Sequence, residues 1–211
     1  MTREEHMNQS HAEKLLRMLA RGLRHPMAHS PLQVDTGGWA AVDAVVEFTN
    51  QHRADVGLWA PITTENLIEI VAVDSERFEI GDGHVRARYG HSIPHVVVGE
   101  PRRPPILLLH GTSRELVDSI RTHGLQPGSR CAVHLTSDES YSLHIAQEAG
   151  DDGIVLTIRA VEAAAAGVEF RQATQHVWLS SEVPARFIDA GSFAALQLPA
   201  FPLNERRSPA N

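Results

Sequence analysis

Cysteine and lysine are almost absent from this sequence, since each occurs once in 211 residues. The single thiol, Cys131, excludes a disulfide framework and a cysteine-rich zinc site, and it favours a reducing interior. Long apolar runs are also missing, so no segment is expected to span a bilayer. The polar, acidic N-terminus does not have the pattern of a secretory signal. We therefore expect a cytoplasmic protein without a membrane partner.

Because lysine is so rare, arginine carries the positive charge, and its planar fork pairs well with phosphate. A biased genomic base composition would also replace lysine with arginine throughout the chain. The formal net charge of −7 argues against a broad electrostatic surface for nucleic acid and leaves a local basic pocket as the alternative. A hydrophobic content of 42% is sufficient for one domain or for two small lobes.

The most informative stretch covers residues 106–138. Four apolar residues at its start predict a short buried strand that ends at His110, Gly111 and Thr112. Thr112 and Glu115 have the spacing of a capping box, so we expect a helix to begin there. A histidine would then lie between the end of a strand and the N-terminus of a helix.

The same stretch returns through Arg130 to a second predicted strand, residues 132–136, which contains His134. Gly111 would allow a ligand to approach the backbone, and a helix N-terminus favours phosphate. These features together predict a cradle for an anion or a nucleotide. The stretch matches none of the common glycine-rich fingerprints.

The N-terminal half has the outline of a winged-helix lobe over residues 11–95. We expect residues 1–10 to be a disordered tail. Apolar residues at helical spacing predict three helices, and alternation after Asp74 predicts a β-hairpin that turns at residues 81–83. The helices are expected over residues 11–23, over residues 39–48 and from residue 63 or 64 to residue 71.

The C-terminal half is expected to form a second lobe over residues 106–192, built from short strands and helices. Residues 96–105 contain one glycine and three prolines, which is typical of a linker. Residues 193–211 are expected to be a tail.

Several short motifs occur in a distinctive order between residues 23 and 179. They are Leu23-Arg24-His25, Gly38-Trp39-Ala40, Arg77-Phe78, Gly90-His91-Ser92, Leu109-His110-Gly111-Thr112, Gly124-Leu125, Arg130 with Val133-His134-Leu135, and Val177-Trp178-Leu179. In this order they resemble the RNA 2′-phosphotransferase family of KptA type.

The resemblance implies an α+β fold with an N-terminal winged-helix-like lobe that binds RNA and a C-terminal ADP-ribosyltransferase-like β-sheet lobe that binds NAD. The implied transferase removes an internal RNA 2′-phosphate, such as one left by tRNA splicing, through an ADP-ribosylated 2′-phospho-RNA intermediate. Its products are 2′-hydroxyl RNA, ADP-ribose 1″,2″-cyclic phosphate and nicotinamide. We expect a monomer that uses NAD as co-substrate and no metal.

The resemblance also implies roles for individual residues. The catalytic set is Arg24, His25, Arg77 and Arg130. The NAD-binding set is His110, Gly111, Thr112, His134, Thr136, Gly90, His91 and Ser92. Such a reaction must hold two polyanions against each other, which bidentate arginines do well, and the 2′-phosphate is already an anionic nucleophile that needs no strong base.

Simpler interpretations exist for most of these residues. Arg24 and His25 could only complement a helix dipole, and His110 and His134 could be satisfied core histidines. A zinc site at His91 and His95 is disfavoured because Pro94 lies between them and no helix presents them together. Cys131 could be a reactive thiol beside Arg130, or a small residue in a strand. Tyr89 could stack on a base or pack in the core.

Some features depart from the family pattern. The first helix carries Arg17 and Arg21 where the family is commonly richer in leucine, and the loops at residues 26–38 and 51–61 look long. These segments flank Arg24, so the surface that is expected to face RNA differs from that of the family. Two other functions therefore stay open: ADP-ribosylation of terminal phosphates of RNA or DNA, and RNA binding without catalysis.

Overall fold

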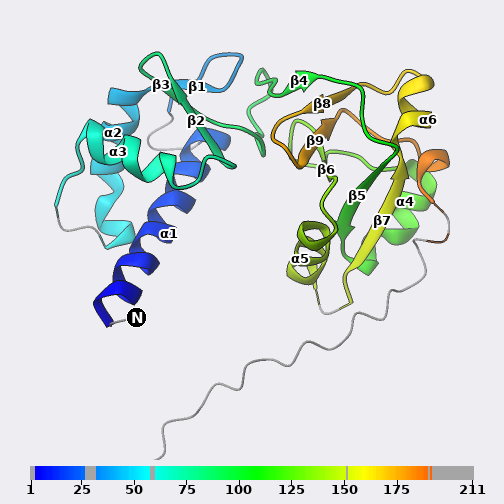
Figure 1. The fold of residues 1–211 in the computed structure, drawn as a ribbon, viewed down its shortest axis with the longest axis horizontal. Coiled ribbons are helices and arrows are strands. Elements are labelled where there is room, and N and C mark those ends of the chain that lie inside the picture. Colours follow the sequence, from blue (N-terminus) through cyan, green and yellow to red (C-terminus); the bar gives the residue numbers. More distant parts are fainter. Residues whose placement is uncertain (1–2, 27–31, 58–59, 151, 190, 192–211) are drawn as a thin grey trace, which may run out of the picture.

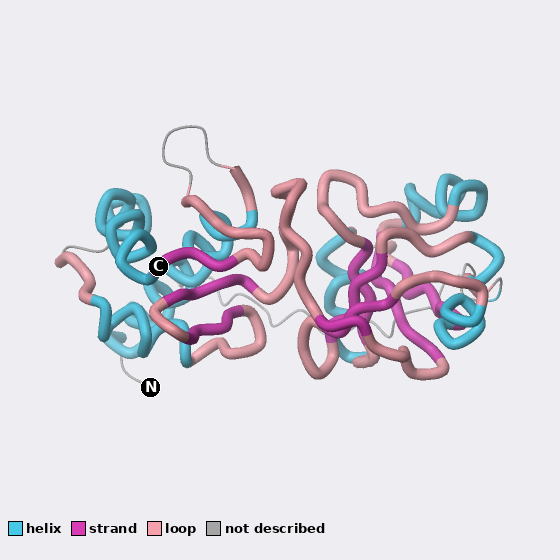
Figure 2. The backbone as a smooth tube through the Cα atoms, turned by 90° about the horizontal axis from the view of Figure 1, so that it is seen from above, coloured by secondary structure: helices cyan, strands magenta, loops and turns pink. Residues whose placement is uncertain are grey.

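The computed structural model describes residues 3–26, 32–57, 60–150, 152–189 and 191. Helices and strands are mixed, and the strands form two separate sheets, one with three strands and one with six. Figures 1 and 2 show two parts side by side, each with its own sheet and helices. Separate clusters of buried residues lie under the two sheets. The mixed α and β content of the fold prediction is confirmed.

The N-terminal part contains three α-helices and a small antiparallel sheet of strand order β1-β3-β2. Its elements are α1 (Arg3–Arg24), β1 (Trp39–Ala41), α2 (Val42–His52), a 3₁₀ turn (Arg53–Val56), α3 (Thr64–Ala72), β2 (Phe78–Gly81) and β3 (His84–Ala87). The predicted leucine face of the first helix is confirmed, because Leu15, Leu16, Leu19 and Leu23 are all buried.

Helix α1 begins much earlier than the sequence predicts. It is helical from Arg3, so the expectation of a disordered tail over residues 1–10 is wrong for residues 3–10.

The helix expected to begin at Trp39 is preceded by a strand. Residues Trp39–Ala41 form β1, which pairs antiparallel with β3 and places Trp39 opposite Arg86. The Arg86 guanidinium lies 4.4 Å from the centre of the Trp39 ring. The helix therefore starts at Val42, because pairing with a strand over forty residues away overrides the local helical pattern.

The C-terminal part is built on a fully antiparallel sheet of order β4-β8-β9-β6-β5-β7. Its elements are β4 (Glu100–Pro101), β5 (Leu107–Thr112), a 3₁₀ turn (Arg114–Leu116), α4 (Val117–His123), β6 (Val133–Thr136), α5 (Glu139–Ala149), β7 (Ile154–Arg159), α6 (Ala160–Ala165), β8 (Phe170–Gln172), β9 (Val177–Ser180) and a second 3₁₀ turn (Ala185–Phe187). The expected linker at residues 96–105 includes β4, which pairs with β8. The tail expected over residues 193–211 lies outside the described residues.

Strand β5 does not stop where the sequence suggests. It pairs with β7 along its whole length, from Leu107 opposite Arg159 to Thr112 opposite Ile154. The 3₁₀ turn after it begins without a side-chain cap, and α4 starts only at Val117. The predicted capping box and the helix N-terminus at Thr112 are therefore wrong, because cross-strand pairing extends the strand to Thr112.

Gly111 has a packing role that the sequence did not predict. A Cβ atom there would lie 2.5 Å from the carbonyl oxygen of Ser142 and 2.7 Å from the backbone nitrogen of Ala146. Both atoms belong to α5, which packs directly across β5. The glycine is thus required for the contact between this helix and the sheet. Among the described helices, none is long and apolar enough to cross a membrane.

We predict that Gly111→Ala lowers the free energy of unfolding by about 1–3 kcal/mol, because the added methyl group overpacks a helix–strand contact. Gly81→Ala is the matched control, since no atom lies within 4 Å of a Cβ at Gly81. Urea titration of both variants measures the difference. Equal stabilities would contradict the packing role.

Candidate active site

A cleft of about 590 Å³ lies where the two parts of the molecule face each other. Its walls come from the end of α1, from the segments flanking the β2–β3 hairpin, from β5, β6 and the loop before β6, and from α5. The lining residues are Arg24, Arg77, Tyr89, Gly90, Leu109, His110, Gly111, Arg130, His134, Leu135, Thr136, Tyr141, Ser142, Ile145, Glu148, Ala149 and Val177. Residues from both ends of the sequence thus meet in one cavity.

Arg24 is the most constrained charge in this cleft. Its Nε and Nη2 atoms are buried and have no hydrogen-bond partner among the described residues. Its guanidinium lies 4.9 Å from the centre of the Tyr89 ring. Burial lowers the pKa of Arg24, and the positive charges of Arg77 and Arg130 lower it further. Buried donors without partners are costly, so this guanidinium is prepared to receive an anion.

Gly90 makes room for Arg24. Its φ is 91°, and a Cβ atom there would lie 3.1 Å from both Cδ and Nε of Arg24. The sequence assigned this glycine to the cofactor. The structure places its backbone against the arginine, so Gly90 lines the cleft and supports the position of the charge.

Arg77 and Arg130 reach the same cleft from different parts of the chain. Arg77 comes just before β2, and its Nε pairs with the carboxylate of Asp74, which orients the side chain. Arg130 is exposed on a turn in which its backbone N–H donates to Pro127 O at 3.2 Å. Three guanidiniums therefore converge, and Glu148 is the one carboxylate among the lining residues.

His25, the fourth predicted catalytic residue, lies next to this cleft and not in it. It lines a neighbouring recess that shares Arg24 and Arg77 with the cleft. Its Nδ1 lies 2.8 Å from Ser92 Oγ, and the Ser92 N–H donates to Arg24 O at 2.9 Å. Burial lowers the pKa of His25, and the charges of Arg24, Arg130 and Arg21 add to this. A neutral imidazole at this position can exchange a proton.

His110 and His134 lie on neighbouring strands at the floor of the cleft. His110 Nδ1 lies 2.8 Å from His134 O, so His110 donates there and leaves its Nε2 as an acceptor. His134 Nε2 is buried without a partner among the described residues. Burial, aided by Arg130 and Arg24, lowers the pKa of His134 to about 3, and burial also lowers that of His110. Both rings are neutral near pH 7.

Three predicted cofactor residues are not among those that line the cleft. Thr112 is buried near the end of β5 that pairs with Ile154, and Ser92 bonds His25. His91 is 2% exposed and borders a smaller cavity of about 230 Å³. Thr136, by contrast, lines the cleft as predicted and accepts a hydrogen bond from the Asp138 N–H at 3.0 Å.

Cys131 lies just before β6, so the expectation that it is a strand residue is wrong, and its surroundings also disfavour a reactive thiol. Its thiol lies 3.1 Å from Ile93 O, and burial raises its pKa. A raised pKa disfavours the reactive thiolate. In the described part of the chain, no group of three or more histidine, cysteine, aspartate or glutamate side chains is arranged to hold a metal ion.

Helix α5 forms a wall of the cleft that no sequence motif indicated. Tyr141, Ser142, Ile145 and Glu148 line the cleft from this helix. Burial raises the pKa of Tyr89 to about 12, and the neighbouring Tyr141 side chain contributes to this rise. The available signal was composition: the chain has only two tyrosines, and both lie here.

Comparison with known proteins identifies the family of the chain. The family described as "RNA 2'-phosphotransferase, Tpt1 / KptA family" matches residues 10–182. The chain belongs to this family. A "Probable RNA 2'-phosphotransferase" of Acetivibrio thermocellus is 34% identical over 83% of this chain and 94% of that protein. One of Pseudomonas paraeruginosa is 38% identical over 83% of this chain and 97% of its own length.

The residues that match the Tpt1/KptA family include the whole candidate site. The matched residues begin before Arg24 and end after Val177, so both walls of the cleft lie within them. The first turns of α1 and the residues beyond 182 lie outside the match.

We predict that the protein loses stability as the pH falls from about 7 to about 5. Unfolded histidines take up protons near pH 6.5, whereas the pKa in the folded state is about 4 for His91 and about 3 for His134. The unfolded state then binds more protons, so each residue removes up to about 2 kcal/mol over this range. Urea unfolding at several pH values measures the slope.

His134→Gln should make this pH dependence shallower, because it removes one buried imidazole. His123→Gln is the control, since His123 is exposed on α4. Parallel pH profiles for the wild type and His134→Gln would contradict the assignment.

Proposed function

We propose that this protein removes an internal 2′-phosphate from RNA by an NAD-dependent transfer. Membership in the RNA 2′-phosphotransferase family supports the RNA 2′-phosphate as substrate. The observation that carries the proposal concerns Arg24, whose Nε and Nη2 atoms are buried without a hydrogen-bond partner among the described residues, in a cleft shared with Arg77 and Arg130. An RNA spliced from two pieces, such as a tRNA, is the expected substrate, and the protein is expected to act in the cytoplasm as a monomer.

The arginines would hold the phosphate that is transferred. Guanidinium forks bind phosphate oxygens in pairs and neutralise the charge that builds up when a phosphoryl centre is attacked. Arg24 provides donors that no described protein group satisfies, Arg77 is oriented by Asp74, and Arg130 approaches from the opposite part of the molecule. His25, held by Ser92, is placed beside them to move a proton.

The remaining walls of the cleft fit NAD. The volume lies within the range of cofactor pockets, and His134 Nε2 is a buried polar atom that no described residue satisfies. His110, His134 and Thr136 would hold the nucleotide beside Tyr89 and Tyr141. When bound, NAD would supply an ADP-ribosyl group that accepts the phosphate and releases nicotinamide. Neutral histidines avoid repulsion between cations in a cleft that already contains three arginines.

The two parts of the fold match the two tasks. Three helices followed by a hairpin support a winged-helix-like lobe that binds RNA. The six-stranded antiparallel sheet, with its histidines on β5 and β6, supports an ADP-ribosyltransferase-like lobe that binds NAD.

The proposal is tested with an oligoribonucleotide that carries one internal 2′-phosphate. With NAD, the RNA should lose the phosphate and one nicotinamide should appear for each phosphate removed; without NAD, neither should occur. RNA that keeps its phosphate would refute the proposal. A 5′-phosphorylated strand that gains the mass of ADP-ribose would identify the alternative function, and binding of RNA without turnover would identify a non-catalytic protein.

We predict that Arg130→Ala slows RNA dephosphorylation about 10²–10³-fold, the usual effect of removing one donor to a charged transition state. Nicotinamide release should slow less, because Arg130 would act on the phosphate. Arg130→Lys should recover part of the rate, since it restores the charge without the fork. Dephosphorylated RNA and nicotinamide should be measured in parallel. Arg103→Ala is the control, because Arg103 is exposed and does not line the cleft. Unchanged dephosphorylation would remove Arg130 from the phosphate site.

A further inference from the structure

We propose that Arg17 and Arg21 extend the phosphate site along helix α1 and bind backbone phosphates of the nucleotides next to the 2′-phosphate. The inference rests on the proposed function and deepens it, because it assigns the path of the RNA strand. The site as described above assigns no other function to Arg17 and Arg21.

The geometry places three arginines of the C-terminal half of α1 on one track. Arg17, Arg21 and Arg24 occur at i, i+4 and i+7, so they share one face of the helix. At 1.5 Å per residue, the track is about 10 Å long. The recess beside α1 is lined by Arg17, Ala20, Arg21, Arg24, His25 and Arg77. It shares Arg24 and Arg77 with the cleft, so a strand bound at the cleft can continue into it.

The charge of this recess is unusual for the molecule. Four arginines and one histidine line it without a carboxylate, although the net charge of the chain is −7. Arg17 and Arg21 are exposed, and the charge of Arg21 helps to lower the pKa of His25, which places it near the candidate catalytic residues. Arg17 pairs with Glu13 at 3.2 Å, but both side chains are more than half exposed. Such a surface pair is weak, so a phosphate can compete for Arg17.

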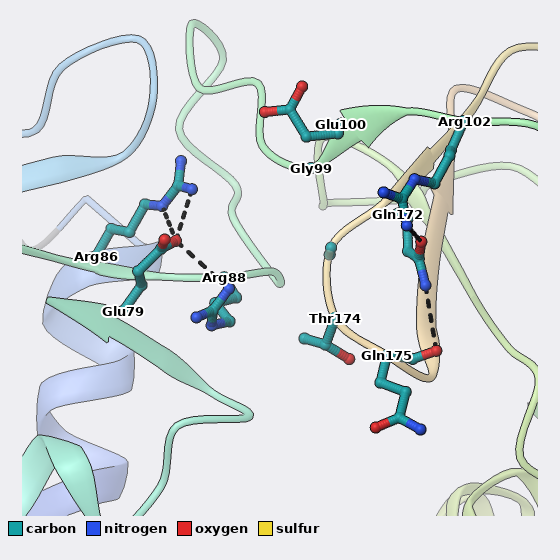
Figure 3. A pocket seen from close by; sticks show the side chains of 10 residues that line it. Glu79, Arg86, Arg88, Gly99, Glu100, Arg102, Gln172, Thr174 and Gln175 are labelled. Atoms are coloured by element: carbon teal, nitrogen blue, oxygen red, sulfur yellow. Dashed lines mark hydrogen bonds and ion pairs between the residues drawn. The ribbon is translucent and has the colours of Figure 1, made fainter.

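A second opening between the two parts is less suitable for RNA. It also contains three arginines, which Figure 3 shows beside acidic and amide partners. Arg86 and Arg88 both pair with Glu79, at 2.6 and 3.5 Å, and Arg102 Nη1 donates to Gln172 Oε1 at 2.7 Å. Glu100 adds another negative charge. These arginines are already neutralised or bonded, which leaves the α1 track as the stronger phosphate surface.

The test is the salt dependence of RNA binding by Arg17→Gln/Arg21→Gln. Each phosphate contact to a single strand contributes about 0.7 to the slope of log affinity against log salt. The double variant should therefore reduce the slope by about 1.4, so that between 50 and 200 mM salt the wild type loses about sevenfold more affinity than the variant. The ligands are 2′-phosphorylated oligoribonucleotides extended by several nucleotides on the 5′ or the 3′ side.

The matched control is Arg102→Gln/Arg103→Gln, which removes two exposed arginines at or near the other opening. A slope that is reduced only in the α1 double variant supports the proposal. A second supporting result is that lengthening the oligonucleotide on one side raises the affinity of the wild type but not that of the α1 double variant. Equal slopes in the two double variants, or a change only in the control, would overturn it. Thermal unfolding checks that both variants fold, as expected for exposed positions.

The outcome is separable from that of the proposed function. Wild-type turnover of a 2′-phosphorylated dinucleotide, which is too short to reach Arg17, tests the function alone. Turnover of the dinucleotide with unchanged salt dependence in the double variant would refute only the track. Absence of turnover, with salt-dependent binding that requires Arg17 and Arg21, would refute only the function.

Discussion

Burial of the Nε and Nη2 atoms of Arg24 without a hydrogen-bond partner among the described residues is the constraint on which the rest of the site depends. Such a charge is unfavourable unless an anion completes it, and nearby groups are arranged to keep it in place. The Gly90 backbone lies against it, the Tyr89 ring lies beside it, and Ser92 anchors the adjacent backbone. A guanidinium held in this way is organised for an anion before the anion binds.

The same positive charge explains the state of the histidines around it. His25, His91 and His134 are each buried to some degree, and the Arg24 charge lowers the pKa of each further. Neutral imidazoles can accept hydrogen bonds from ribose hydroxyls and do not repel the arginines. Protonation below pH 5 would place further cations beside Arg24, so stability and site chemistry depend on the same groups.

The distribution of charge reconciles an acidic protein with a polyanionic substrate. The net charge of the chain is −7, whereas Arg17, Arg21 and Arg24 of α1, together with Arg77 and Arg130, line the cleft and the recess next to it. Other arginines are neutralised locally, as Arg86 and Arg88 are by Glu79. Arg17 and Arg77 have carboxylate partners as well, whereas Arg24 has none among the described residues, so RNA would meet uncompensated positive charge there. This favours a defined orientation of the RNA over nonspecific binding.

The sequence by itself determined the candidate residues of the site and the local periodicity of most elements. Four basic residues, two histidines and the leucine face of α1 could all be identified from motifs and spacing. The tertiary structure decided which of these residues meet. Pairing with β7 extends β5 through Thr112, pairing with β3 converts Trp39–Ala41 to a strand, and the packing of α5 gives Gly111 its role and brings Tyr141 into the cleft. Local patterns specify the period of an element, whereas strand partners and helix docking depend on residues far away in the sequence.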